Sequence, residues 1–207
     1  PGVPLRLKPA NASSEAPARG TVQQVYDQIL TDIDSAIAYA PDFSESATFS
    51  VPAGHALAAR VNLFLKNWQD AATHARLAYT NHPLMSLEEL TGGFAEPTSE
   101  WIWSIQYTPD DNSGYPTLGS FYDNRILGYS SLRADIDFLA MIDTENDMRM
   151  NWWERADGDW VLSQGGGKFT KFIHTSNQDM DAVMFRSSEM YLIEAEAEAR
   201  LHNWTNA

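Results

Sequence analysis

The sequence of 207 residues predicts a mainly α-helical protein, in which paired helices flank an irregular insert that contains short strands. Apolar residues recur at helical spacing in the first part of the chain and again near its end. Between them, over residues 83–182, aromatic and β-branched runs alternate with glycine, proline and aspartate. A short motif also recurs, as "LKNWQDA" at 65–71 and "LHNWTNA" at 201–207. The recurrence indicates a repeated helical unit.

The first element is a long amphipathic helix that follows an extended lead-in. Residues 1–20 are rich in proline, alanine, serine and glycine, which disfavour a core of their own. Thr21 is a good N-cap, and apolar residues follow it at helical spacing as far as Ala40. Pro41 then ends the helix, because proline cannot continue it.

The next two helices form a hairpin. Ser50 can cap a helix and Pro52 suits its first turn, so a helix is expected as far as about Lys66. Asn67 interrupts it, and a second helix is expected over residues 68–81. Its predicted packing face consists of Trp68, Ala71, Ala72, Ala75 and Ala78. Two helices joined by a tight turn within roughly 34 residues are typical of tetratricopeptide-like repeats.

The insert has a different character. Residues 101–107, "WIWSIQY", predict a strand, with Trp101 and Trp103 on one face as packing residues. Residues 108–124 predict a long loop, 133–142 a short helix, and 160–173 two short strands around a glycine turn. Helical spacing returns from Val183 to Leu201, which we interpret as the first half of a second hairpin. We expect the natural protein to continue beyond Ala207.

Charge and composition exclude several classes of protein. The chain has 28 acidic and 14 basic side chains, a formal net charge of −14. It would repel nucleic acid, and no basic patch offsets that repulsion. The absence of cysteine excludes disulfides, thiolate metal sites and a cysteine nucleophile.

An ordered series of segments carries a resemblance to a known family. The series is "GVPL" (2–5), "TVQQVYDQILTDIDSAI" (21–37), "ALAARVNLFLKNWQDAATHA" (56–75), "SEWIWSIQY" (99–107), "FLAMIDTENDMRM" (138–150), "GKFTKF" (167–172) and "FRSSEMYLIEAEAEARLHNW" (185–204). Its most specific element is R-x-x-E-x-x-L-I-x-A-E-A, which consists here of Arg186, Glu189, Leu192, Ile193, Ala195, Glu196 and Ala197. The succession resembles the SusD/RagB family of surface glycan-binding lipoproteins of the Bacteroidetes.

The resemblance implies a function and a place in the cell. Members of the family capture oligosaccharides or polysaccharides and sit on a SusC-like TonB-dependent transporter. They lie on the extracellular face of the outer membrane, anchored by a lipidated N-terminal cysteine that would lie outside these residues. Members are about twice as long as this chain. We therefore expect residues 1–207 to be the central part of one SusD-like domain: lead-in 1–20, helices 21–82, insert 83–182 and half-hairpin 183–207.

The insert is the expected glycan-binding region. Sugars offer apolar C–H faces and many hydroxyls, so aromatic side chains flanked by carboxylates, amides and arginine suit them. Each single aromatic residue is more often core than platform, but the cluster as a whole predicts a sugar platform. The candidates are Tyr115, Phe121, Tyr122, Asp123, Asn124, Arg125, Tyr129, Trp152, Trp153 and Trp160. Trp68 and Trp204, at the hairpin turns, are expected to be structural.

Other charged patterns favour structural roles. Arg186 and Glu189 are expected to form a helical i,i+3 pair. Glu194, Glu198 and His202 are expected to line a solvated helix face, not a metal site. Asp110 and Asn112 resemble part of a calcium loop, but the glutamate and glycine spacing of an EF-hand are missing. Residues 165–168, "GGGK", are expected to form a turn. We therefore expect no cofactor, with calcium the one alternative.

Two further functions remain open. A helical-repeat scaffold that binds a protein partner would show an exposed apolar groove on the hairpins and no aromatic platform. A glycan-cleaving enzyme would need two carboxyl groups about 5–9.5 Å apart across the scissile bond. No such pair stands out, and the five histidines have no motif partner. The sequence therefore favours a binding protein without enzymatic activity.

Overall fold

The computed structural model describes residues 2–11, 13–43, 45–111, 133–143, 145–154, 167–172 and 180–205. It divides into two compact units. The helical unit comprises Pro1–Asn81 and Ser187–Ala207, and the insert unit comprises His82–Arg186. None of the described helices is both long and apolar enough to cross a membrane.

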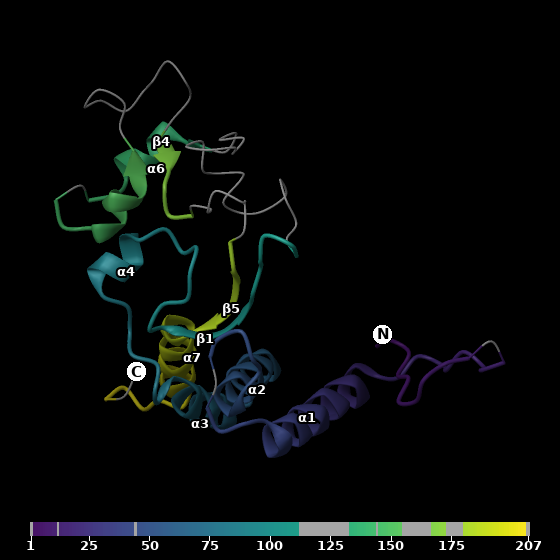
Figure 1. Ribbon diagram of the computed structural model, residues 1–207. Helices are drawn as coiled ribbons and strands as arrows, with labels where there is room; N and C mark the ends of the chain where they lie inside the picture. The colour runs from purple at the N-terminus through teal and green to yellow at the C-terminus, as the bar shows by residue number, and fades with distance from the viewer. Residues whose placement is uncertain are drawn as a thin grey trace. The chain divides into compact units, whose positions relative to one another are not determined.

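In the part of the helical unit that the structure describes, the helices are α1 (Val22–Tyr39), α2 (Val51–Leu65), α3 (Trp68–Tyr79) and α7 (Ser187–Arg200). Helix α1 packs on α2, while α3 packs on both α2 and α7 (Figure 1). The mainly helical fold class and the hairpin of α2 and α3 are thus confirmed. Helix α3 ends at Tyr79, two residues before the predicted end.

Local signals position the helix ends. Thr21 and Gln24 form a capping box: the Thr21 hydroxyl accepts from Gln24 N at 3.1 Å, and Gln24 Oε1 accepts from Thr21 N at 2.8 Å. The predicted start of α1 is therefore confirmed. Ser50 does precede α2, but its side chain makes no capping hydrogen bond. Lys66 ends α2 in a left-handed conformation with φ of 64°, and its N–H donates to the carbonyls of Asn62 and Leu63.

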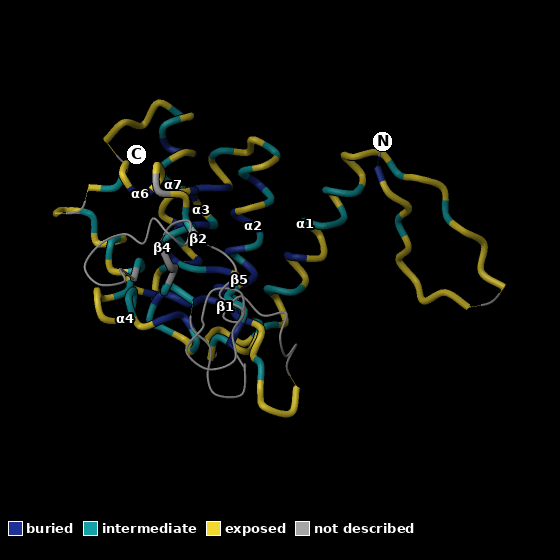
Figure 2. Tube along the Cα trace, turned by 90° about the horizontal axis from the view of Figure 1, so that it is seen from above, coloured by how far each residue is buried: buried dark blue, intermediate teal, exposed yellow. Residues whose placement is uncertain are grey.

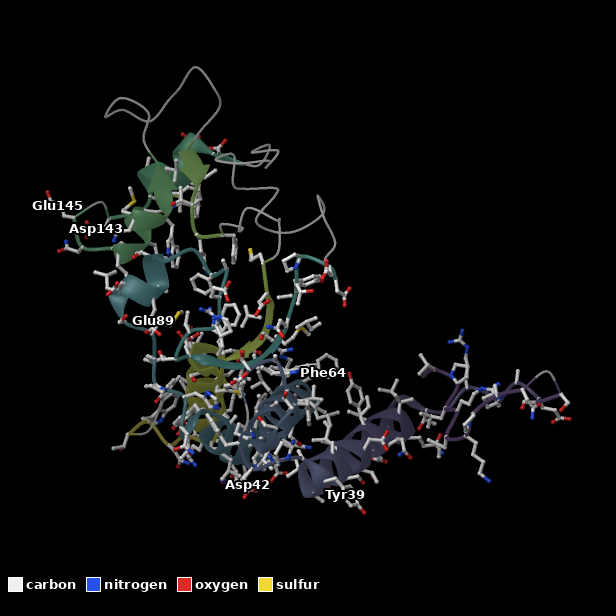
Figure 3. All side chains as sticks on the ribbon, in the orientation of Figure 1. Tyr39, Asp42, Phe64, Glu89, Asp143 and Glu145 are labelled. Carbon is white, nitrogen blue, oxygen red and sulfur yellow. The ribbon has the colours of Figure 1, made fainter. Side chains whose placement is uncertain are left out.

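Alanines form the core of the hairpin. Ala53, Ala56, Ala58 and Ala59 of α2 and Ala71, Ala72, Ala75 and Ala78 of α3 are all buried. Figure 2 shows buried segments along both helices. Small side chains let two helix backbones approach closely, so packing here depends on close fit more than on large apolar groups. Larger aromatic groups lie at the margin: Phe64, labelled in Figure 3, is mostly exposed and stacks on Tyr26 at 5.4 Å.

The described strands of the insert unit form two small sheets. Strand β1 (Trp101–Ile105) pairs antiparallel with β5 (Ala182–Arg186), so that Trp101 lies opposite Arg186. In the second sheet β4 (Gly167–Phe169) lies between β2 (Arg133–Ala134) and β3 (Trp153–Glu154). The described residues of the unit also form α4 (Leu87–Thr91), α6 (Ile136–Ala140) and the 3-10 helix η1 (Met148–Trp152).

Polar contacts fix α4 to the segment before β1. Ser86 and Glu89 form a second capping box at the start of α4. The Glu89 carboxylate (Figure 3) also accepts hydrogen bonds from the backbone N–H and the hydroxyl of Ser99, at 2.9 and 3.0 Å. These bonds lower the pKa of Glu89, the backbone N–H of Ser99 most of all. Trp101 is buried and packs near Phe94, and the half-buried Trp103 stacks on Phe185. The predicted packing role of the two tryptophans is confirmed.

The structure corrects several predicted boundaries. The helix predicted from Val183 begins only at Ser187, because residues 182–186 form β5 and pair with β1. The helix predicted over 133–142 is shorter, since Asp135 caps it and Ala140 ends it. The predicted strand at 101–107 ends at Ile105. One of the two strands predicted around the glycine turn is β4, while most of the turn lies outside the described residues.

Candidate functional site

Two of the ten predicted site residues, Trp152 and Trp153, fall within the described residues. The other eight lie outside them: Tyr115, Phe121, Tyr122, Asp123, Asn124, Arg125, Tyr129 and Trp160. The two adjacent tryptophans can therefore be compared directly, and their surroundings differ.

Trp152 is held on two sides. It is half-buried at the end of η1, and its Nε1–H donates a hydrogen bond to the carbonyl oxygen of Leu90 at 2.8 Å. The Lys171 ammonium lies over its ring, with Nζ 4.4 Å from the ring centroid. A cation over an indole contributes about 0.5–2 kcal/mol, more as it loses water. Trp152 thus connects α4, η1 and the segment after β4 within the insert unit.

Lys171 lies at the centre of an aromatic cluster. Its Nζ is 5.0 Å from the centroid of Phe94 and 5.3 Å from that of Phe172. Phe94 and Phe172 meet edge to face at 5.9 Å, and the Arg186 guanidinium lies 5.3 Å from the Phe94 centroid. We call Phe94, Trp152, Lys171, Phe172 and Arg186 the cation–aromatic cluster. It joins four separate stretches of the insert unit.

The electrostatics of this cluster follow from burial. Loss of water lowers the pKa of Lys171, and the like charge of Arg186 lowers it further. The nearby Glu100 carboxylate opposes both effects, and Glu100 is itself buried. The aromatic rings around the Lys171 ammonium therefore replace part of the water that it loses. In this cluster the aromatic residues have a structural role.

Trp153 is half-buried as well, but its contacts differ. It lies in β3, opposite Phe169, and its ring meets that of Phe138 of α6 edge to face at 6.2 Å. Phe138 is 50% exposed. Phe138 was not among the site residues predicted from the sequence; it lies in α6, a helix of only five residues. The pair of Trp153 and Phe138 offers partly exposed aromatic surface of the kind that sugar C–H groups contact.

Two of the predicted charge patterns are wrong. Arg186 belongs to β5 and does not form the predicted helical pair with Glu189; the Glu189 carboxylate instead binds Arg60 of α2. Glu194 and Glu198 do not line a solvated face, because both bind Arg76 of α3, and Glu198 is only 3% exposed.

Metal sites of three or more ligands are absent from the described part of the chain. His202 lies beyond Glu198 in a left-handed conformation, with its ring 5.8 Å from that of Trp204. In the acidic turn of Figure 3, Asp143 accepts hydrogen bonds from the backbone of Glu145 and the side chain of Asn146. Asp110 of the predicted calcium loop is exposed, and Asn112 lies outside the described residues.

One contact was missed altogether by sequence reasoning. His55 of α2 and His74 of α3 face each other, with their Nδ1 atoms 3.0 Å apart. Nineteen positions separate them in the sequence, and only the antiparallel packing of the hairpin brings them together. A helical-wheel comparison of the two predicted helices could have shown that both histidines adjoin the alanine face.

A family model matches part of this chain, and several solved structures share its fold. A family model for SusD-like proteins, described as "Starch-binding associating with outer membrane", matches residues 1–63. Over 99% of its length the chain superposes on 45% of a SusD-like carbohydrate binding protein from Bacteroides vulgatus ATCC 8482, with a TM-score of 0.82 and 24% identity. None of the curated proteins matches the sequence.

Two further solved structures have the same fold as this chain. A SusD superfamily protein from Bacteroides thetaiotaomicron VPI-5482 has a TM-score of 0.76 and 22% identity, over 97% of this chain and 48% of that one. A protein described as "Laminarin binding SusD-like protein" has a TM-score of 0.69 and 20% identity, over 94% of this chain and 54% of that one. The chain therefore spans about half the length of the solved structures it matches.

The class of protein is defined by its fold, in which paired helices precede and follow an insert of loops and short strands in the sequence. The particular fold is SusD-like, and the resemblance to the SusD/RagB family predicted from the sequence is confirmed.

Proposed function

We propose that the protein captures oligosaccharides or polysaccharides at the outer surface of the outer membrane and passes them to a SusC-like TonB-dependent transporter. The observation that carries this proposal is the match of nearly the whole chain to a SusD-like carbohydrate binding protein. The description of the family model, which names starch binding and the outer membrane, supports the same function. In this proposal the protein binds its ligand and does not cleave it.

The insert unit supplies the binding surface in this proposal. Trp153 and Phe138 contribute aromatic area, while Trp152 has a supporting role because its indole is occupied by Leu90 and Lys171. The predicted aromatic residues of the long loop, Tyr115, Phe121 and Tyr122, and also Tyr129 and Trp160, would extend the platform. Asp123, Asn124 and Arg125 would bind sugar hydroxyls. Loops on a rigid scaffold are a common place for such a surface.

The test uses the full-length protein, screened first on a glycan array and then by affinity electrophoresis in the best glycan. We expect the Trp153→Ala and Phe138→Ala double variant, and the Tyr115→Ala and Tyr122→Ala double variant, to lose retention. Trp204→Ala is the matched control, because Trp204 is exposed at a hairpin turn outside the insert. Full retention in both double variants, with circular dichroism unchanged, would overturn the site assignment. Absence of any glycan ligand would overturn the function.

A second candidate is a scaffold that binds a protein partner. It is favoured by exposed apolar side chains on the helical unit, among them Leu77 of α3 and Leu192 of α7, the latter 72% exposed. This function predicts that Leu192→Glu abolishes binding of a partner while glycan retention is unchanged. A glycan-cleaving enzyme, by contrast, would release reducing ends steadily, and we expect none from the purified protein.

A further inference from the structure

We propose that His55 and His74 form a chelating site for one divalent first-row transition-metal cation, Cu²⁺ or Ni²⁺. The two imidazoles come from adjacent antiparallel helices, α2 and α3, and their Nδ1 atoms are 3.0 Å apart. Their ring centroids are 5.1 Å apart and the ring planes are inclined by 42°. Both residues are half-buried. This site is independent of glycan binding.

The spacing of the two nitrogens suits a single cation. Metal–imidazole bonds are about 2.0–2.1 Å long, so nitrogens 3.0 Å apart would subtend an angle of about 95° at a shared metal. That angle is close to the right angle of tetragonal Cu²⁺ and Ni²⁺ complexes, and it is well below the tetrahedral angle that Zn²⁺ prefers. Imidazole is also a preferred ligand of copper and nickel.

Without a metal, the same contact is a hydrogen bond that needs one proton between the two nitrogens. A cation can replace that proton, because each Nδ1 then directs a lone pair at the metal. Burial and the neighbouring His74 lower the pKa of His55, so the His55 imidazole is neutral and able to bind a metal at neutral pH. The negative charge of Asp34, on α1, lies close enough to His55 to oppose this shift, and it would also attract a cation.

The helices hold the two ligands in place before a metal binds. His55 lies between the buried residues Gly54 and Ala56, and Ala75, next to His74, is buried as well. Ligands on packed helices lose little freedom on binding, which favours chelation. No third protein ligand completes the site among the described residues. The remaining coordination positions would therefore be taken by water.

The test is a titration of tag-free, full-length protein with Cu²⁺ and with Ni²⁺, each against a competing chelator. We expect one cation per chain, and a copper EPR spectrum that is tetragonal with coupling to two nitrogens. His55→Gln and His74→Gln should each weaken binding by about tenfold or more, because a single imidazole cannot chelate. His202→Asn is the control: it removes an exposed imidazole, and asparagine tolerates the left-handed backbone found there.

Loss of binding in both glutamine variants, with helicity intact and with binding retained in His202→Asn, would support the site. Binding that is unchanged in His55→Gln and His74→Gln would overturn it, and so would wild-type protein that takes up no cation. In the last case the two imidazoles share only a hydrogen bond. Glycan retention would be measured on the same samples, so that failure of the metal site is distinguishable from failure of the proposed function.

Discussion

Arg60 of α2 binds the carboxylate of Glu189 on α7 through two parallel hydrogen bonds, Nε to Oε1 and Nη2 to Oε2, each 2.7 Å long. The two residues are 129 positions apart, so the contact joins the beginning of the helical unit to its end. A second arginine does the same from α3: Arg76 binds Glu194 at 2.6 Å and also binds Glu198. The two contacts differ in burial, and that difference leads to the first prediction.

Replacing Arg76 by glutamine should destabilise the protein more than replacing Arg60 does, because the Glu198 carboxylate, only 3% exposed, would lose its cation. Asn203 would still donate to Glu198 at 2.8 Å, which limits the loss. Arg60→Gln is the matched control. Both side chains of that pair are more than one third exposed, so the loss should be at most about 1 kcal/mol. Urea unfolding of the two variants measures the difference, and equal losses would contradict this account.

These ion pairs also show where sequence reasoning stops. The run "EAEAEA" at 194–199 looks like a solvated helix face, and nothing near it in the sequence identifies Arg76 as a partner 122 positions away. The starts of α1, α2 and α3 were predicted correctly because their signals are local, as in the capping box of Thr21 and Gln24. Strand β5 was missed for the opposite reason: its partner β1 lies far away in the chain, and pairing there overrides a helical pattern.

The candidate site was predictable only as a region. Composition directed attention to the insert, but Trp152 and Trp153 look alike in the sequence. Their roles separate only because Leu90 and Lys171 happen to reach the first, whereas the exposed Phe138 contacts the second. Such neighbours are set by tertiary packing, which no periodicity within the insert encodes.

The second prediction concerns the packing of α1 on α2 at Gly54. A Cβ atom at this position would lie 2.5 Å from Cγ1 of Ile37 and 3.6 Å from Cζ of Phe49. Gly54→Ala should therefore destabilise the protein by about 1–2 kcal/mol, although alanine favours helix formation by up to about 1 kcal/mol.

Gly20→Ala provides the control for this substitution. There the nearest atom to the new Cβ, Leu5 Cδ1, is at an ordinary 3.4 Å, and we expect a change within about 0.5 kcal/mol. Thermal unfolding of both variants tests the idea. A Gly54→Ala protein that is more stable than wild type would show that α1 shifts freely on α2.

The third prediction concerns pH. Burial, and then the charge of His74, lower the pKa of His55 below its ordinary 6.5, while Asp34 opposes the shift. At a pH between the folded-state pKa of His55 and its higher unfolded-state pKa, the unfolded chain binds a proton at His55 that the folded chain does not. Stability should thus be complete above about pH 7.5 and fall as the pH drops through 6.5 toward the folded pKa.

His55→Gln should flatten this loss of stability when unfolding is measured from about pH 7.5 to about pH 5. Part of the slope should remain, because burial also lowers the pKa of His82 in the insert unit. His202→Asn, which removes an exposed imidazole, is measured beside it as the control. An unchanged slope in His55→Gln would mean that His55 gains a compensating partner when it is protonated.

The fourth prediction separates the two tryptophans. Trp152→Ala removes a hydrogen bond to Leu90 and a ring that the Lys171 ammonium contacts, so it should cost about 2–3 kcal/mol in the unfolding of the insert unit. Trp153→Ala removes an edge-to-face contact with the half-exposed Phe138, and we expect a smaller loss of about 1 kcal/mol.

Glycan retention should respond in the opposite order. Trp153→Ala should weaken retention at temperatures where the fold is intact, because it removes aromatic surface that a sugar can contact. Trp152→Phe keeps an aromatic ring for Lys171 but loses the hydrogen bond to Leu90, so it should retain glycan like the wild type while unfolding earlier. Thermal unfolding and affinity electrophoresis on the same full-length variants decide between the two roles. If Trp152→Phe loses retention while remaining as stable as the wild type, then Trp152, not Trp153, faces the sugar.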